Sequence, residues 1–303
     1  MQAHHARRQA RARGVRPSPV QDVIRRAKPL LGTVVEVRID DAHPPTDGAH
    51  ERALATAFDV IGRVDALMSV HRVDSDLSRL HAAPPGDAVS VHPWTVRVLR
   101  EAQRMHAITG GLFDPTVARL LVEHRLLPRP PGPEAEPDAR LSDVVFAGPT
   151  TIVKKRPVWL DFGGIAKGFA VDMAVLALRH AGVRNGVVCA GGDLRVFGCN
   201  EQPIHVRCPD APNQIRLIGM LGRGAAASSG NYFAESFDRP AHVSAIQSPL
   251  ASARPEGAQP GVTCIAPRCI WADALTKVVT LAGNKSPAAQ RALLAYHAYA
   301  IAS

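Results

Sequence analysis

The 303-residue sequence has few aromatic residues, no long apolar run and no paired cysteine motif. Phe, Trp and Tyr together make up 5% of the chain. No stretch approaches the roughly 18 consecutive apolar residues of a membrane span, so we expect no membrane-spanning helix. The five cysteines are odd in number and form no C-x-x-C pair, which argues against a disulfide framework and against a zinc site.

Positive charge is concentrated at the N-terminus. Residues 1–28 hold eight Arg or Lys against one acidic residue, so most of the formal net charge of +9 lies there. This composition predicts a disordered basic tail over residues 1–28 and a single domain over residues 29–303. The alternative is binding of nucleic acid or of an anionic membrane, and no aromatic residues are interleaved to stack bases. The tail lacks the apolar region of a secretory signal, so we expect a cytoplasmic protein as written, or a periplasmic one if the start is misassigned.

Hydrophobic periodicity predicts a mixture of helices and strands. Apolar residues recur at helical spacing over residues 50–68, 93–109, 165–181, 272–282 and 287–296. Alternating or β-branched runs predict strands over residues 31–39, 144–146, 151–153, 158–160, 186–189, 194–197, 204–207, 215–220 and 225–228, with a short strand at the C-terminus. The Pro-rich residues 128–138 predict a surface loop, and residues 231–262 fit no regular pattern. Because helices and strands do not alternate steadily, we expect an α+β fold.

The stretch D-F-G-G-I-A-K-G, residues 161–168, turns from a short apolar run into a helix. Helix N-terminal N–H groups favour anions, and Lys167 would add a positive charge for a phosphate. The spacing is not that of a Walker A loop. The D-F-G letters do not indicate a kinase either, because the glycine-rich loop and catalytic loop that should precede them are missing. Simple strand-to-helix packing is the alternative interpretation of this turn.

Two further segments carry polar residues at suggestive spacing. In G-G-L-F-D-P-T, residues 110–116, Asp114 could cap a helix or bind a ligand. In A-D-A-L-T-K, residues 272–277, helical spacing places Asp273, Thr276 and Lys277 on one face. Carboxylate and hydroxyl oxygens suit Mg²⁺. The alternative is an Asp–Lys pair on an exposed helix face, which stabilises by only a few tenths of a kcal/mol.

In combination and in order, the motifs resemble those of one family. They are L-L-G-T (30–33), M-S-V-H-R-V-D-S-D-L-S-R-L (68–80), T-G-G-L-F-D-P-T-V (109–117), L-D-F-G-G-I-A-K-G-F-A-V-D (160–172), A-G-G-D-L-R-V-F-G (190–198), S-S-G-N-Y (228–232) and A-D-A-L-T-K (272–277). The sequence is thereby similar to the FAD:protein FMN transferases (ApbE-like flavin transferases) over about residues 29–283. The resemblance implies an α+β fold of two interlocked lobes around a long FAD cleft. It also implies Mg²⁺-assisted cleavage of the FAD pyrophosphate, with FMN passed to a Thr or Ser hydroxyl of an acceptor flavoprotein and AMP released.

Carried over residue by residue, the resemblance implies a set of site residues. The expected FAD contacts are Leu31, His71, Leu112, Phe113, Asp114, Asp161 and Lys167. The expected metal ligands are the Gly164 carbonyl, Asp273 and Thr276, and the residue expected to assist the acceptor hydroxyl is His242.

The sequence departs from the family pattern at three of its positions. His71 stands where the family usually has Tyr, Lys277 stands where it has Thr, and the segment after His242 lacks the family's D-P. At the metal helix, either Thr276 takes over as a ligand or Lys277 replaces part of the metal's charge. These departures leave two alternatives to transfer: an FAD pyrophosphatase that uses water as acceptor, or a flavin-binding protein without catalysis.

Overall fold

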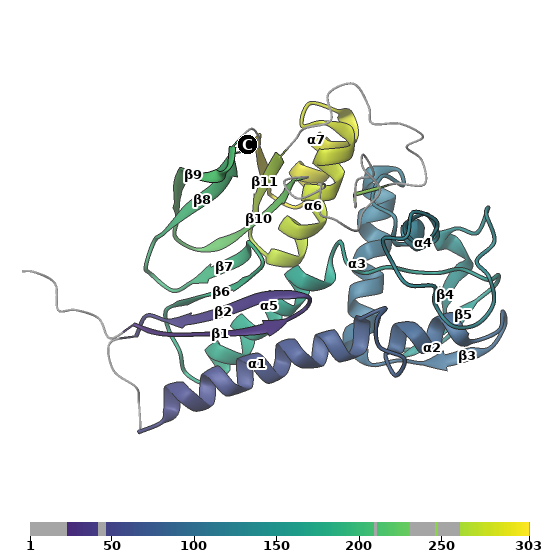
Figure 1. Ribbon diagram of the computed structural model, residues 1–303, viewed down its shortest axis with the longest axis horizontal. Coiled ribbons are helices and arrows are strands. Elements are labelled where there is room, and N and C mark those ends of the chain that lie inside the picture. The colour runs from purple at the N-terminus through teal and green to yellow at the C-terminus, as the bar shows by residue number, and fades with distance from the viewer. Residues whose placement is uncertain (1–22, 42–46, 209–210, 231–245, 248–260, 303) are drawn as a thin grey trace, which may run out of the picture.

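The computed structural model describes residues 23–41, 47–208, 211–230, 246–247 and 261–302 (Figure 1). Its largest sheet has seven strands in the order β1-β2-β6-β7-β10-β11-β12, and all of its pairings are antiparallel. These strands are β1 (Ile24–Leu30), β2 (Thr33–Ile39), β6 (Gly186–Ala190), β7 (Asp193–Phe197), β10 (Gly224–Gly230), β11 (Gly261–Ala266) and β12 (Tyr299–Ala302).

Three helices build the core that covers this sheet. They are α1 (Ala49–Met68), α5 (Ala166–His180) and α6 (Cys269–Ala282). Helix α5 packs between α1 and α6, and α6 also contacts β10 and β11. Buried apolar residues of these helices and strands form one continuous hydrophobic core cluster. The N-termini of α5 and α6 are thereby held next to each other by the core.

A second group of elements surrounds a small sheet, seen at the right of Figure 1. The sheet has the order β3-β5-β4 and is antiparallel. The group contains α2 (Asp76–Ala82), β3 (Ala88–Ser90), α3 (Pro93–Thr109), the 3-10 helices η1 (Pro115–Val117) and η2 (Leu141–Asp143), α4 (Ala118–Glu123), β4 (Val144–Phe146) and β5 (Thr151–Lys154). Val144 and Ile152 of this sheet belong to the same core cluster as Val35 of β2. Both groups of elements therefore share one core.

The remaining elements are a hairpin and a helix. The hairpin is β8 (Gln202–Cys208) with β9 (Ala211–Leu221), and helix α7 (Pro287–Ala295) packs on α3 and α6.

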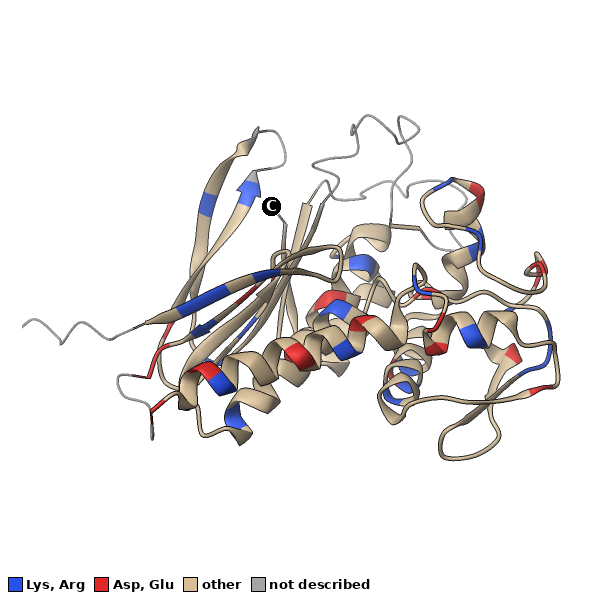
Figure 2. Cartoon of the chain, turned by 60° about the horizontal axis from the view of Figure 1, so that its bottom comes forward, with Lys and Arg blue, Asp and Glu red and all other residues tan. Residues whose placement is uncertain are grey.

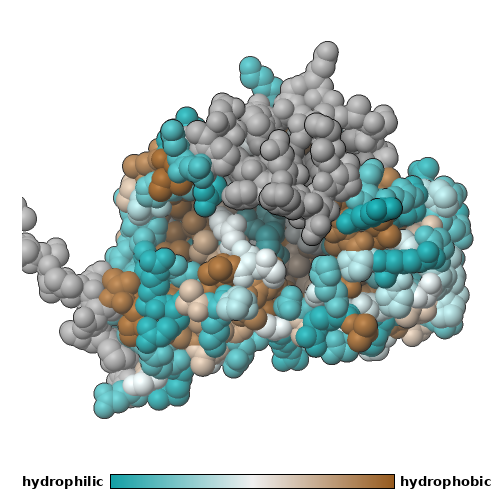
Figure 3. All heavy atoms as spheres, viewed as in Figure 1, coloured by the Kyte–Doolittle hydropathy of each residue, from teal (hydrophilic) through white to brown (hydrophobic). Residues whose placement is uncertain are grey.

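Acidic and basic residues alternate along α1 (Figure 2). Apolar residues are scattered over the visible face in small groups (Figure 3). Among the described residues, no helix has the length and apolar character needed to cross a membrane.

The α+β prediction is confirmed, and most predicted elements appear close to their expected bounds. Helix α3 has the predicted bounds because Pro93 stands in its first turn and Gly110 ends it at φ 65°. The strand predicted at residues 158–160 is wrong. These residues are buried but pair with no strand, because the Leu160 N–H donates to the ring of His81 at 2.9 Å. Residues 128–138 contain no helix or strand.

Residues 24–28, which the sequence assigned to the tail, belong to strand β1. Arg25 pairs with Glu36, Arg26 pairs with Glu51 at 2.6 Å, and the Lys28 ammonium lies 4.8 Å from the centre of the Phe58 ring. These cations therefore belong to the fold and are partnered by it. Residues 1–22 lie outside the described residues.

Candidate functional site

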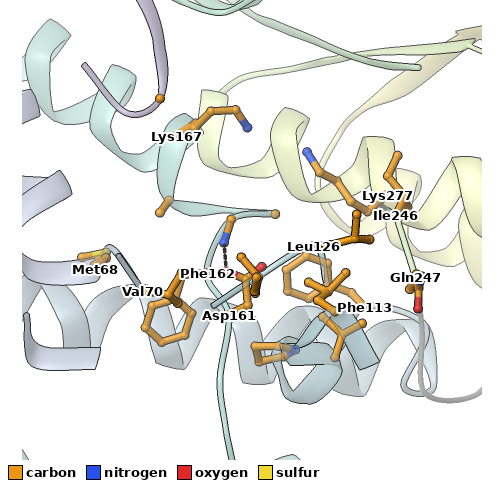
Figure 4. A pocket seen from close by; sticks show the side chains of 18 of the residues that line it. Met68, Val70, Phe113, Leu126, Asp161, Phe162, Lys167, Ile246, Gln247 and Lys277 are labelled. Atoms are coloured by element: carbon orange, nitrogen blue, oxygen red, sulfur yellow. Dashed lines mark hydrogen bonds between the residues drawn. The ribbon is translucent and has the colours of Figure 1, made fainter. Parts of the chain in front are cut away.

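A cavity of about 690 Å³ lies where the two groups of elements meet. Such a volume is within the range of small-molecule sites. Its walls come from the β1–β2 turn, the end of α1 and the segment after it, residues 112–117, the 161–167 turn, the end of β10 and one face of α6. In Figure 4 the side chains of Met68, Val70, Phe113 and Phe162 lie below those of Lys167 and Lys277, and Ile246 lies beside Lys277.

The 161–168 stretch forms the turn that leads into α5. The Asp161 N–H donates to the Pro115 carbonyl at 2.8 Å, which ties the turn to the 112–117 segment. The Gly163 N–H donates back to the Asp161 carboxylate at 3.0 Å. The N-cap residue of α5, Ile165, makes no side-chain cap, but the Gly168 N–H in the first turn donates to Asp273 at 2.9 Å. Gly163, Gly164 and Lys167 line the cavity. The helix N-terminus therefore presents a positive end to the cavity, as an anion site requires.

Lys167 is the first cation at this end of the cavity. Its ammonium lies 3.0 Å from Asp193 Oδ2 and 3.4 Å from Asp273 Oδ1. Burial alone would lower the pKa of Lys167, but these two carboxylates raise it above its ordinary value. Lys167 is therefore charged throughout the physiological range.

Asp273 lies behind the cavity wall, fully buried on α6. Its Oδ2 accepts the Gly168 N–H at 2.9 Å, and its Oδ1 pairs with the ammoniums of both Lys167 and Lys277. Burial would raise the pKa of Asp273, but the two ammoniums lower it to about 2. In Figure 4 the two lysines extend from α5 and α6 with their ammonium ends toward each other. Lys167, Asp273 and Lys277 thus form one ionic cluster, with Lys277 at the cavity.

As arranged, these residues do not fit a divalent cation. The Oδ1 of Asp273 is taken by two ammoniums, and its Oδ2 by a backbone N–H. The Thr276 hydroxyl donates to the Asp273 carbonyl at 2.7 Å and lies 2.7 Å from the Ser229 hydroxyl. Within the described ranges, no three His, Cys, Asp or Glu side chains are grouped to hold a metal. The positive groups at this end are therefore the ammoniums of Lys167 and Lys277, which pair with the carboxylates of Asp193 and Asp273.

Part of the cavity wall is apolar, and one turn in it has unusual backbone. Leu31 has φ 55° and Gly32 has φ 68°, so both residues of the β1–β2 turn are left-handed. A positive φ is rare for leucine, and here it accompanies a two-residue hairpin turn of the kind that favours this conformation. Phe113 packs against Gly164, since a Cβ built on Gly164 would lie 3.4 Å from the ring. This wall suits a flat, partly apolar ligand.

Asp114 acts as a cap in this structure. Its Oδ1 accepts the Thr116 N–H and hydroxyl, both at 2.8 Å. Asp161 also lines the cavity, and burial raises the pKa of its carboxyl although the Gly163 N–H and Lys167 favour the charged form.

Most of the residues expected from the sequence lie around this cavity. Its lining includes Leu31, His71, Leu112, Phe113, Asp114, Asp161, Gly164 and Lys167. Asp273 and Thr276 do not line it and are fully buried behind it. His242 lies outside the described residues. Sequence reasoning missed Asp193 and Ser229, although both stand in the family's motifs, because their partners are far away in the sequence.

Known proteins of similar sequence share one name. A protein from Vibrio cholerae named FAD:protein FMN transferase is 27% identical over 280 residues, which cover 85% of this chain and 80% of that protein. A protein of the same name from Haemophilus influenzae is also 27% identical, over 84% of this chain and 79% of its own. The match to a third, from Rhodobacter capsulatus, covers only 51% of that longer protein.

Solved structures share the fold, and the family model covers nearly the whole chain. The flavin transferase ApbE from Vibrio cholerae superposes with a TM-score of 0.75 at 23% identity, over 93% of each chain. The ApbE protein from Thermotoga maritima gives a TM-score of 0.72 at 26% identity, over 90% of each chain. The model of the ApbE family matches residues 31–299, which confirms the resemblance of the motifs: this protein belongs to the ApbE family.

Proposed function

We propose that this protein is an FAD:protein FMN transferase that takes FAD as substrate and modifies an acceptor flavoprotein. The observation that carries the proposal is the cavity itself, whose lining combines the first turn of α5 and two lysines with apolar side chains that include Phe113. FAD combines an anionic pyrophosphate with two flat ring systems. Membership of the ApbE family and the name shared by its relatives support this choice of substrate.

Some of these residues would bind the rings of FAD, and others would stabilise the negative charge of its pyrophosphate. Leu31, Leu112 and Phe113 would pack against a ring of FAD, while the α5 N-terminus and Lys167 would face the pyrophosphate. In the reaction, the oxygen of an acceptor Thr or Ser attacks the phosphorus of the FMN half. The bond to the AMP oxygen breaks, and AMP leaves. Phosphoryl transfer of this kind depends mainly on positioning and on neutralising charge.

Two carboxylates have different roles in this scheme. Asp114 positions the 112–117 segment through its hydrogen bonds to Thr116, so it shapes the wall without touching the reacting atoms. Asp161 faces the cavity with a raised pKa, which suits a group that accepts the proton of the acceptor hydroxyl. His242, outside the described residues, is the other proposed acceptor of this proton.

The test is a transfer assay read by mass. The protein is incubated with FAD and a flavin-acceptor domain, and the denatured acceptor is analysed by mass spectrometry. The expected result is a covalent gain of one FMN together with release of one AMP. Lys167→Met should reduce the rate by at least about tenfold, since it removes a charge-assisted contact. Lys155→Met, a change at an exposed lysine away from the cavity, is the matched control.

The other outcomes identify the alternatives. AMP release without any mass gain on the acceptor would identify an FAD pyrophosphatase. Tight FAD binding with no AMP would identify a flavin-binding protein. Absence of FAD binding would refute the assignment of the cavity.

A further inference from the structure

We infer that Lys277 takes the place of a divalent cation at the anionic end of the cavity, so that FAD binds without Mg²⁺. The inference rests on the proposed function only in taking FAD as the ligand. It is carried by the contacts of Asp273, the carboxylate that the sequence assigned to a metal.

Both carboxylate oxygens of Asp273 have partners within the protein. Asp273 is fully buried, and a buried carboxylate needs partners for both of its oxygens. The Gly168 N–H satisfies Oδ2 at 2.9 Å. Oδ1 pairs with Lys277 and, at 3.4 Å, with Lys167. The carboxylate is thus neutralised within the protein, and neither oxygen needs a metal.

Lys277 is held beside Asp273 and also reaches the cavity. Its ammonium also donates to the Asp273 backbone carbonyl at 3.0 Å. Its stem packs on the turn, because a Cβ built on Gly164 would lie 3.7 Å from its Cγ and 3.8 Å from its Cε. The side chain is 17% exposed and lines the cavity. An ammonium has three donors; two are used on Asp273, and the third is left for a ligand in the cavity.

The remaining side chain on this helix face that could supply an oxygen ligand is Thr276. Thr276 is fully buried and does not line the cavity. Its hydroxyl donates to the Asp273 carbonyl and is hydrogen-bonded to the Ser229 hydroxyl. Mg²⁺ requires oxygen ligands in near-octahedral geometry, and this helix face offers it an ammonium instead. Lys167 in the first turn of α5 and Lys277 on α6 both line the cavity, and lysines can bind phosphate oxygens as point charges. The pyrophosphate of FAD would therefore meet Lys277 and Lys167 in place of a metal ion.

The experiment measures FAD affinity in two buffers, one with excess EDTA and one with millimolar Mg²⁺, by quenching of flavin fluorescence. The dissociation constant of the unchanged protein should agree within about twofold between the buffers. Lys277→Met keeps the length of the side chain but removes its charge, and it should weaken binding by about tenfold in both buffers.

Lys277→Thr is the decisive variant, because it removes the ammonium and places a hydroxyl oxygen one turn from Asp273. It should bind FAD weakly in EDTA and regain about tenfold in Mg²⁺. Lys285→Thr makes the same chemical change at an exposed lysine outside the cavity, and it should leave both affinities unchanged. Thermal melting of each variant checks that it is folded.

Three results would overturn the inference. The first is an unchanged protein that binds FAD with Mg²⁺ but not with EDTA, which leaves the proposed function intact. The second is a folded Lys277→Met protein that binds FAD as tightly as the unchanged protein in EDTA. The third is stoichiometric Mn²⁺ binding by the unchanged protein in electron paramagnetic resonance titrations, a measurement that needs no variant. Failure to bind FAD in either buffer would instead refute the proposed function.

Discussion

Gly168→Ala tests the packing that holds the two site helices together. A Cβ built on Gly168 would lie 2.3 Å from the Cys269 carbonyl oxygen and 2.8 Å from Asp273 Cβ. An ordinary contact needs 3.4 Å or more, so α6 would have to retreat by about 1 Å at its first turn. The carbonyl is backbone and cannot rotate away alone. The substitution should therefore displace α6 as a unit.

The magnitude follows from two opposing effects. Replacing Gly by Ala inside a helix is worth about 0.5–1 kcal/mol in favour of folding. Overpacking a close contact costs about 1–3 kcal/mol or more. Because the clash involves backbone, we expect the upper part of this range and a net loss of about 2 kcal/mol. For a chain of this size the melting temperature should fall by about 3 °C.

The assay is thermal unfolding followed by circular dichroism, with Gly62→Ala as the matched control. Gly62 lies inside α1, and a Cβ there would meet nothing within 4 Å. This control should raise the melting temperature by about 1–2 °C. Gly168→Ala should also weaken FAD binding, because the Gly168 N–H that holds Asp273 would move. A Gly168→Ala protein as stable as the unchanged one would refute the reasoning.

Two further predictions concern buried polar groups. Burial and the charge of Lys154 lower the pKa of His81 to about 3, so between pH 6.5 and 3 only the unfolded chain binds this proton and stability falls as the pH falls. When the pH is lowered from 7 to 5, the free energy of unfolding measured in urea should fall by about 2 kcal/mol more for the unchanged protein than for His81→Gln. Equal decreases in the two proteins would contradict this prediction. Asp172 accepts the Cys269 N–H at 3.0 Å and pairs with Arg195 at 2.7 Å. Asp172→Ala should cost about 3 kcal/mol of unfolding free energy, and a cost below about 1 kcal/mol would show that water replaces the carboxylate.

The sequence predicts those elements whose signals are local. Helix α3 carries its start at Pro93 and its end at Gly110, so its bounds follow from neighbouring residues alone. Strand β11 (Gly261–Ala266) escapes prediction because it is buried along its whole length between β10 and β12. A central strand of this kind has no alternation to read. Strand β1 escapes because its basic residues resemble a tail until Glu36 and Glu51 are placed beside them.

The residues of the candidate site also divide into those that a local motif locates and those that only the fold brings together. Motif order locates the 161–168 turn and the 112–117 segment, and the structure brings both to one cavity. The partners of Lys167 could not be predicted in the same way. Asp193 stands 26 residues further along the chain and Asp273 more than a hundred, and only the packing of α5 against β7 and α6 brings them to one ammonium. Ion pairs between residues far apart in the chain produce no periodic pattern in the sequence, so residue spacing cannot predict them.

The Asp273–Lys277 spacing shows what periodicity leaves undetermined. The sequence allowed either a metal site or an exposed ion pair four residues apart on a helix. In the structure Asp273 and Lys277 do form an ion pair, but Asp273 is fully buried. An exposed pair would contribute a few tenths of a kcal/mol. A buried carboxylate that lost its partner would cost about 3–5 kcal/mol. Asp273 therefore requires a cation beside it, and in this chain the cation is covalently part of the helix. Spacing gives the pairing of two residues, and only burial decides whether that pairing is incidental or part of the site.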